Sequence, residues 1–435
     1  MTMITRKQLW LILVGTLLGF LPTGAFASTA AYDSLFTEDR LRIDLIFCGN
    51  AHQEDVFLAG YQHEKTWSAP KVGLVEEYGY GNYVYRLFDG QRCVFSKGFN
   101  SLFQEWTTTP EAHTLDKAMT TSLWVPFPKV DLRLVVYKRS EQDGQLYELF
   151  ETVIDPDSKM IRRGTQNNWP VYTVQEMGDP SDHVDIVFIA EGYTAQEMDK
   201  FRADCHRFAE NLFAMAPYDR HREDFNIWAV ESASPESGTD LPHQDTWRQT
   251  VLNTHFYTFY SDRYLTVPDQ TLAASLAANT PCDALYIIVN TDIYGGGGIY
   301  NYYGLSMSDG KYSAEVFVHE FGHSFANLGD EYYDDSVTYE EFFSPKVEPH
   351  VPNLTSLVDF DSKWKDMLEE GCPIPTPQTE ENMDKVGVYE GGGYVTHGLY
   401  RPMIDCRMKT NRAPAFCPVC QRAIVRMIGH YTRKP

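Results

Sequence analysis

The segment from 318 to 332, V-H-E-F-G-H-S-F-A-N-L-G-D-E-Y, holds the side chains best suited to catalysis. His319 and His323 are four residues apart, so on a helix both imidazoles project from one face and can bind a single metal ion. Glu320 follows the first histidine, where a carboxylate can act as a general base toward water held at the ion. A chain of this composition contains roughly 0.03 such H-E-x-x-H matches by chance. The motif therefore predicts a hydrolytic zinc site.

The residues around the motif predict a helix. Phe317, Phe321 and Leu328 fall near one stripe at helical spacing and can pack against a core. Asn327 and Gly329 tolerate left-handed backbone and can end the helix. A core helix whose histidines only form hydrogen bonds is the alternative, but such a helix has no need of a glutamate between them.

Candidates for a third zinc ligand follow the helix. A catalytic zinc ion usually takes three protein ligands and keeps one position open. Asp330 is the first candidate, because the chain turns just before it and can bring a carboxylate back toward the histidines. Glu331 and the more distant His397 are the alternatives.

The first residues have the pattern of a secretory signal peptide at 1–27. Arg6 and Lys7 precede an apolar run at 9–21, and a small-residue site ends at Ala27. The run is short for a membrane anchor, and no later segment is long and apolar enough to cross a bilayer. We therefore expect a secreted protein, periplasmic or extracellular, with no membrane span after removal of the signal.

The overall composition is that of a folded, acidic protein. Hydrophobic residues make up 43% of the chain and aromatic residues 14%, which excludes a disordered chain. The formal net charge of −23 argues against nucleic acid as a partner. A length of 435 residues is too great for one ordinary core and indicates two domains.

The eight cysteines predict disulfides in an exported chain. Cys48 and Cys93 stand alone in the first third of the sequence and are expected to pair with each other. Cys417 and Cys420 form a C-x-x-C motif like half a zinc ribbon or a redox motif, without a second copy. Structural bridging near the active site is the favoured interpretation of that motif.

Residues 28–165 are expected to form a β-sandwich domain. Short alternating segments at 83–87, 132–137 and 147–150 are separated by Gly, Asp and Pro. No catalytic constellation appears in this part, so binding, spacing and scaffolding are alternative roles for it.

Residues 166–435 are expected to form an α/β catalytic domain, which makes the whole chain an α+β two-domain protein. A linker rich in Gly, Asn, Asp and Pro is expected at 163–182. Alternation of strands with helices indicates mainly parallel pairing in one sheet. The expected elements are strands at 184–190, 226–230 and 285–289 and a helix at 196–213.

A run of four glycines precedes the zinc motif. Glycines such as Gly297 and Gly298 let backbone approach a ligand closely, and residues 299–303 are expected to form an edge strand that an extended peptide can join. These two glycines, Ile299 and Tyr300 are therefore candidate substrate-binding residues. A flexible turn is the alternative.

The order of these motifs resembles the metzincin clan of zinc peptidases. In that clan an H-E-x-x-H helix and a glycine turn are followed by a methionine-containing turn beneath the metal. Met408, preceded by Cys406, matches that turn, and Met403 after Pro402 is a second candidate. The resemblance implies that Met408 is part of the packing floor of the site.

The mature chain as a whole resembles the family of IgA-specific metallopeptidases with its N-terminal β domain. The stretches that carry this resemblance are V-D-I-V-F-I-A-E-G-Y (184–193), Y-G-G-G-G-I-Y-N (294–301), H-E-F-G-H-S-F (319–325), G-D-E-Y (329–332), V-G-V-Y-E-G (386–391), Y-R-P (400–402) and F-C-P-V-C (416–420). The resemblance implies zinc ligands at His319, His323 and Asp330 and a base at Glu320. In the usual metzincin spacing the third ligand falls on Gly329, one residue earlier.

These patterns together predict a secreted zinc endopeptidase acting on a polypeptide substrate. Zinc would polarise the scissile carbonyl, and Glu320 would carry a proton from water to the leaving amine. Tyr400 or Arg401 is a candidate for steadying the oxyanion, with a role in the fold as the alternative.

Two other functions and one further ion stay open as alternatives. One function is a zinc amidase acting on cell-wall peptide or another non-protein amide, and the other is a secreted binding protein with structural zinc. A calcium ion is the further ion, although an acidic run is more typical of a solvated loop. The residues concerned are Asp334, Asp335, Glu340 and Glu341.

Overall fold

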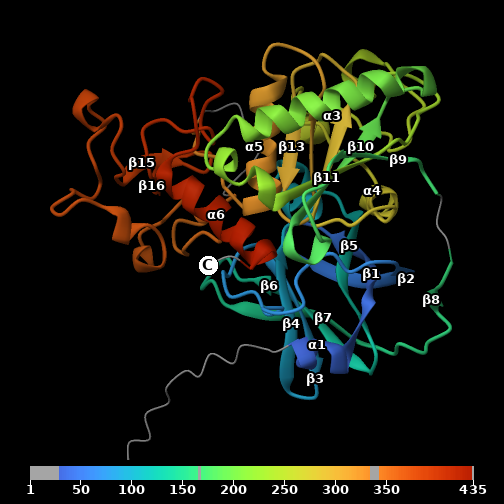
Figure 1. The fold of residues 1–435 in the computed structure, drawn as a ribbon. Helices are drawn as coiled ribbons and strands as arrows, with labels where there is room; N and C mark the ends of the chain where they lie inside the picture. Colours follow the sequence, from blue (N-terminus) through green and yellow to red (C-terminus); the bar gives the residue numbers. More distant parts are fainter. Residues whose placement is uncertain (1–28, 165–167, 334–341, 434–435) are drawn as a thin grey trace, which may run out of the picture.

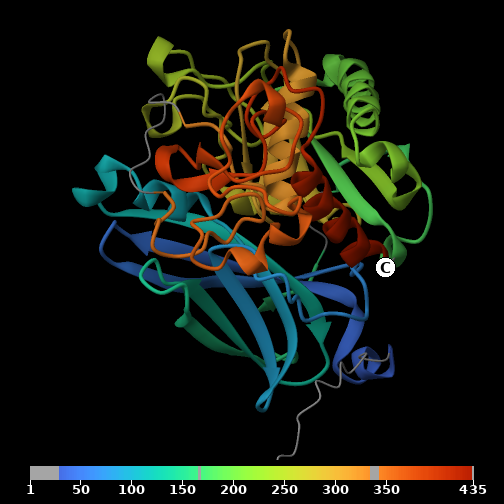
Figure 2. The same ribbon diagram turned by 90° about the vertical axis from the view of Figure 1, so that its left-hand side faces the viewer.

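The computed structural model describes residues 29–164, 168–333 and 342–433. Figures 1 and 2 show two halves, with the N-terminal strands (blue to teal) beneath the sheet and helices of the second half. The chain is thus a two-domain protein of mixed α and β structure. The expected signal peptide and the acidic residues proposed for calcium lie outside the described residues.

The N-terminal domain contains two four-stranded sheets. Their orders are β5-β1-β2-β8 and β4-β3-β6-β7. The first sheet contains β1 (Phe36–Gly49), β2 (Glu54–Glu64), β5 (Lys117–Pro128) and β8 (Ile161–Arg162), and the second contains β3 (Tyr83–Asp89), β4 (Arg92–Phe99), β6 (Leu132–Arg139) and β7 (Leu146–Ile154). The three segments expected as strands from their alternation lie within β3, β6 and β7. Two short helices, α1 (Thr29–Leu35) and α2 (Leu102–Thr107), flank these strands.

Aromatic rings join the two sheets of this domain. Phe47 of β1 lies against Tyr83 of β3, with 5.2 Å between ring centroids, and against Phe99 of β4 at 6.2 Å. All three side chains are buried. Aromatic and β-branched residues favour strands because they pack well on a pleated, half-buried surface. The core of this domain therefore lies between the two sheets.

The C-terminal domain, expected to be catalytic, is built on a six-stranded sheet of order β13-β14-β12-β10-β11-β9. Its inner strands pair in parallel, and only the two edge strands are antiparallel to their neighbours. Mainly parallel pairing was expected, as were β10, β11 and β12 at nearly these positions. The strands are β9 (Val171–Gln175), β10 (Val184–Glu191), β11 (Phe225–Val230), β12 (Ala284–Val289), β13 (Gly296–Ile299) and β14 (Tyr303–Met307).

Two sequence predictions about this sheet are wrong. The edge strand expected at 299–303 is instead β13, which ends at Ile299, because Asn301 adopts a left-handed φ of 51° and the chain reverses there. The linker expected at 163–182 contains strand β9, which pairs with β11. Turn-forming residues surround that short strand and conceal its alternating pattern.

Four helices support the sheet, and one of them carries the H-E-x-x-H motif. They are α3 (Met198–Phe213), α4 (Gln270–Ala277), α5 (Ser313–Ala326) and α6 (Pro418–Thr432). Helix α5 packs on β13 and β14 and also contacts α3 and α6. Phe317 and Phe321 are fully buried, and Asn327 ends the helix in left-handed conformation (φ 51°), as predicted. A small hairpin, β15 (Tyr389–Gly392) and β16 (Val395–Arg401), completes the elements.

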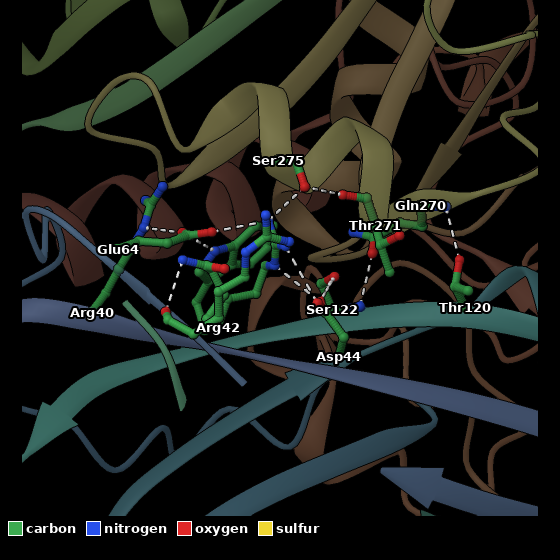
Figure 3. Close-up of polar contacts among 12 residues, drawn as sticks. Arg40, Arg42, Asp44, Glu64, Thr120, Ser122, Gln270, Thr271 and Ser275 are labelled. Carbon is green, nitrogen blue, oxygen red and sulfur yellow. Dashed lines mark hydrogen bonds and ion pairs between the residues drawn. The ribbon is translucent and has the colours of Figure 1, made fainter. Parts of the chain in front are cut away.

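The two domains meet at a buried polar network centred on Glu64 (Figure 3). This carboxylate pairs with Arg40 at 2.8 Å and with Arg42 at 2.9 Å. Arg42 also donates to Ser275 at 3.0 Å, and Arg40 to the carbonyl of Ala277, both in α4. The charged cluster of the N-terminal sheet therefore packs on a helix of the C-terminal domain.

Asp283, which accepts a hydrogen bond from Ser68 of the N-terminal domain at 3.1 Å, predicts a pH effect on stability. Burial, reinforced by the neighbouring Asp185 carboxylate, raises the pKa of Asp283 to about 8. The folded state therefore holds a proton that the unfolded chain releases near its ordinary pKa of about 4, so stability falls as pH rises between these values. We expect Asp283→Asn, which is neutral throughout, to lose less thermal stability than the wild type between about pH 5 and about pH 8. If the melting temperatures of both proteins fall equally over this pH range, Asp283 is not the group responsible.

The cysteine side chains test the predicted disulfide in the N-terminal domain. All eight cysteines are free thiols, so the predicted Cys48–Cys93 bridge is not formed in this structure. The two residues lie on β1 and β4, which belong to different sheets, and the Cys93 thiol donates to the carbonyl of Phe95. Sharing a domain says nothing about the short separation that a disulfide requires.

Among the helices of the described ranges, none is long and apolar enough to cross a membrane.

Candidate active site

Helix α5 and the segment after it bring three potential metal ligands together. The Nε2 atoms of His319 and His323 lie 3.0 Å apart. Asp330 Oδ1 lies 3.0 Å from the first of these nitrogens and 3.3 Å from the second. Ligands about 2.0–2.1 Å from a tetrahedral zinc ion are separated by about 3.3 Å, so these spacings are close to those of a zinc site.

The surrounding hydrogen bonds orient these three groups for a cation. Nδ1 of His319 donates to the carbonyl of Arg407 at 3.0 Å, and Nδ1 of His323 donates to the carbonyl of Leu328. In a neutral imidazole this leaves the Nε2 lone pair free. Two nitrogen lone pairs and the buried Oδ1 of Asp330 then face one another, and Oδ1 has no hydrogen-bond donor among the described residues. Such a donor set fits a zinc ion.

The pKa values of His323 and Asp330 also indicate a site that attracts positive charge. Burial disfavours the imidazolium of His323, but the Asp330 carboxylate outweighs burial and raises the pKa of this histidine to about 9. Burial opposes ionisation of Asp330 as well, yet the two histidines hold its pKa well below the usual range.

Glu320 lies beside the histidines in the same cavity. One of its carboxylate oxygens and a ring nitrogen of each histidine lie within 4.8 Å of one another. Burial raises the pKa of Glu320 above its ordinary value of 4.5, which makes it a better proton acceptor than a solvated carboxylate. The cavity has a volume of about 250 Å³ and is also lined by Asp330, Tyr332 and Tyr394.

The glycine run places strand β13 directly against helix α5. A Cβ on Gly298 would lie 2.4 Å from the carbonyl oxygen of Glu320, so any larger residue would push the strand and helix apart. Of the four residues predicted in this segment to bind substrate, Gly297, Gly298 and Tyr300 line the cavity, whereas Ile299 is buried in the core. The outer edge of β13 is partly occupied, because Gly296 bonds to the backbone of Arg263 and Leu265.

The structure shows which of the remaining candidate residues lie close to the site. Met408 is fully buried beneath α5, where a Cβ on Gly322 would lie 3.1 Å from its sulfur. His397 is on the surface with 83% of its side chain exposed and pairs with Glu390, so it does not join the cluster. Tyr400 does not line the cavity, and its backbone pairs with Thr355, which argues against the oxyanion role considered for it.

Arg401 and Glu331 also point elsewhere. Arg401 is fully buried and donates to the carbonyls of Glu390 and Gly391, so its contacts are those of a residue that holds the hairpin. Glu331 turns away from the histidines and accepts a hydrogen bond from Asn353.

Two positioning residues of the site were missed in the sequence. The side chain of Asn353 bonds both the N–H and the carbonyl of Gly329, at 2.7 and 2.8 Å, and so holds the chain next to Asp330. Tyr394 donates its hydroxyl to Asp330 Oδ2 at 2.6 Å. Neither residue belongs to a local motif, and both come from segments that only the tertiary fold brings here.

The Tyr394 hydrogen bond predicts a change in metal affinity. Tyr394→Phe should weaken metal binding about 10- to 100-fold, because ligand-orienting partners contribute effects of that size. Competition of the protein with a chelator for zinc measures the change. Tyr400→Phe is the matched control and should bind the metal as the wild type does. Equal affinities of both variants and the wild type would contradict the role given to Tyr394.

The N-terminal domain forms part of the cavity wall. Asn100 and Glu105 line the cavity from this domain. The amide of Asn100 donates to Asn327, the residue that ends the catalytic helix, at 3.2 Å. The role of this domain, left open between binding, spacing and scaffolding, thus includes a direct contribution to the candidate site.

Comparisons with known proteins agree with this two-part architecture. Residues 172–386 and 378–428 match the family described as IgA Peptidase M64. Residues 31–151 match the family described as Peptidase M64 N-terminus. A search of curated proteins finds no match. Because these matches cover most of the chain, the protein belongs to the M64 family of IgA peptidases and carries that family's N-terminal domain.

Proposed function

We propose that this protein is a secreted, zinc-dependent endopeptidase. His319, His323 and Asp330 would hold the ion, and Glu320 would act as general base. The observation that carries the proposal is the convergence of two Nε2 atoms and one carboxylate oxygen at 3.0–3.3 Å beside Glu320 in an open cavity. Membership of a peptidase family supports the same activity.

Different residues of the chain have different roles in the proposed hydrolysis. When bound, zinc supplies a Lewis acid that polarises the scissile carbonyl and lowers the pKa of water at its open position. Glu320 accepts a proton from the attacking water and delivers it to the leaving amine. The carbonyls of Arg407 and Leu328 keep both imidazoles in the tautomer that presents Nε2.

The cavity edge supports a polypeptide substrate. Gly296 directs its N–H and carbonyl outward, toward Arg263 and Leu265. Backbone groups alternate in direction along a strand paired on one side, so those of Gly298 point to the same outer side. An extended peptide can bond to Gly298 there, next to Glu320.

The finer description of the two domains is part of the proposal. We assign the N-terminal domain as a β-sandwich, supported by the aromatic contacts between its two sheets. We assign the catalytic domain as metzincin-like, supported by the position of Met408 beneath α5. Export is supported by the signal-peptide pattern at 1–27.

An unbiased peptide-library digest combined with metal analysis tests the proposed function. Purified zinc-loaded protein should cleave internal peptide bonds, a chelator should stop cleavage, and added zinc should restore it. Release of products only from cell-wall fragments or acetylated amides would instead favour an amidase. Cleavage that survives complete metal removal would overturn the proposal.

A further inference from the structure

A second group of potential metal ligands lies behind the candidate active site. The thiols of Cys406, Cys417 and Cys420 and a carboxylate oxygen of Glu331 all lie within 4.8 Å of one another. All four side chains are buried, with 0–4% of each residue exposed. Closed sites with four protein ligands, mostly cysteine, are typical of structural zinc.

The distances within this cluster are those of a metal site. Cys406 Sγ and Cys420 Sγ are 3.8 Å apart. Two sulfurs that each lie about 2.3 Å from a tetrahedral zinc ion are separated by about 3.8 Å, whereas disulfide sulfurs are about 2 Å apart. Cys420 Sγ lies 3.3 Å from Glu331 Oε1, close to the separation of about 3.5 Å expected for a sulfur and an oxygen on one zinc ion.

Glu331 gives independent evidence for a ligand. Its residue is fully buried, and Oε1 accepts from Asn353 at 2.9 Å. Oε2, by contrast, has no hydrogen-bond partner within the described ranges. Removing a carboxylate from water is costly unless its oxygens gain partners, so a bound cation would stabilise this unsatisfied buried oxygen.

The backbone around the cysteines is arranged to stabilise thiolates. Cys417 is the N-cap of helix α6, and its sulfur accepts from the backbone N–H of Cys420 at 3.4 Å. Its own N–H points to Cys406 Sγ at 3.2 Å. Backbone donors and the positive end of a helix favour the thiolate, which is the form that binds metal.

We propose that Cys406, Cys417, Cys420 and Glu331 bind a structural zinc ion, separate from the catalytic ion. This ion joins three segments that shape the active site. Glu331 directly follows Asp330, and its N–H donates to the carbonyl of Met408 at 2.8 Å. The third segment is the start of α6, which packs against the catalytic helix. The ion thereby fixes the third catalytic ligand relative to the methionine turn.

The zinc content per chain, measured after dialysis by inductively coupled plasma mass spectrometry, tests this proposal. The wild type should contain two zinc ions, and His323→Ala and Cys420→Ser one each. Cys205→Ser, which removes a buried thiol elsewhere, should retain two. Another outcome is a wild type with a single zinc ion, which His323→Ala retains and Cys420→Ser loses. That result would support the structural site and contradict the catalytic one.

A measurement on the folded protein covers the case in which Cys420→Ser fails to fold. Cobalt-substituted His323→Ala should show an intense sulfur-to-cobalt charge-transfer band, since only the cysteine site retains metal. Alkylation without reductant should modify all three cysteines once the metal is removed. Loss of all zinc and of this band in His323→Ala, or a disulfide between any two of the three cysteines, would overturn the proposal.

Discussion

Glu320→Gln should bind zinc as the wild type does and lose about 10²- to 10⁴-fold in kcat/KM for peptide hydrolysis. The amide keeps the shape and polarity of the side chain but cannot accept the proton of the attacking water. Because Glu320 faces the cavity beside the histidines rather than holding Asp330, metal content should not change. Hydrolysis of a library-derived peptide, measured together with zinc content, checks both expectations.

Glu315→Gln is the matched control for this experiment. Glu315 lies in the first turn of the same helix and does not line the cavity, so its loss of charge should leave the rate unchanged. A Glu320→Gln variant with full metal and wild-type rates would show that another group acts as the base.

Glu64→Gln should lower the free energy of unfolding by about 3–5 kcal/mol, because it leaves the buried guanidinium of Arg40 without its counter-ion and that of Arg42 with Asp44 alone. Arg40 is 1% and Arg42 4% exposed, and both bond to Glu64. The same arginines reach α4 of the catalytic domain, so the change also weakens the interface between the domains. Urea denaturation followed by tryptophan fluorescence measures the loss.

Glu151→Gln gives the comparison for an exposed pair. Glu151 pairs with Arg133 at 2.6 Å, but about a third or more of each side chain is exposed. Solvated pairs contribute about 1 kcal/mol or less, so this variant should be close to the wild type. If Glu64→Gln loses no more stability than Glu151→Gln, the buried network does not hold the domains as we describe.

Local patterns predicted those parts of the fold that depend on neighbouring residues. Helix α5 ends at Asn327 because its left-handed conformation suits this residue type. Strand β10 is buried throughout and apolar except at Asp185 and Glu191, because both of its faces are covered. The edge strand expected at 299–303 and the linker expected at 163–182 were wrong. The first prediction failed because a left-handed Asn301 reverses the chain within that segment. The second failed because β9 pairs with β11, which is distant in the sequence, and short-range composition does not reveal such pairing.

The candidate site divides in the same way. His319, Glu320 and His323 lie within one helical turn, so their spacing alone brings them together. Asp330 follows a short turn and was found by the same reasoning. Tyr394 and Asn353 reach the site through long-range folding, and so does the association of Glu331 with three cysteines. A C-x-x-C motif indicates two possible ligands, but the other two are visible only in three dimensions.

A crystal structure of the zinc-loaded protein, with anomalous diffraction at the zinc edge, tests the central claim most directly. We predict a peak about 2.0–2.1 Å from Nε2 of both His319 and His323 and about 2.0–2.2 Å from a carboxylate oxygen of Asp330. An enzyme that hydrolyses peptides while its anomalous map shows no peak between these three side chains would contradict the account.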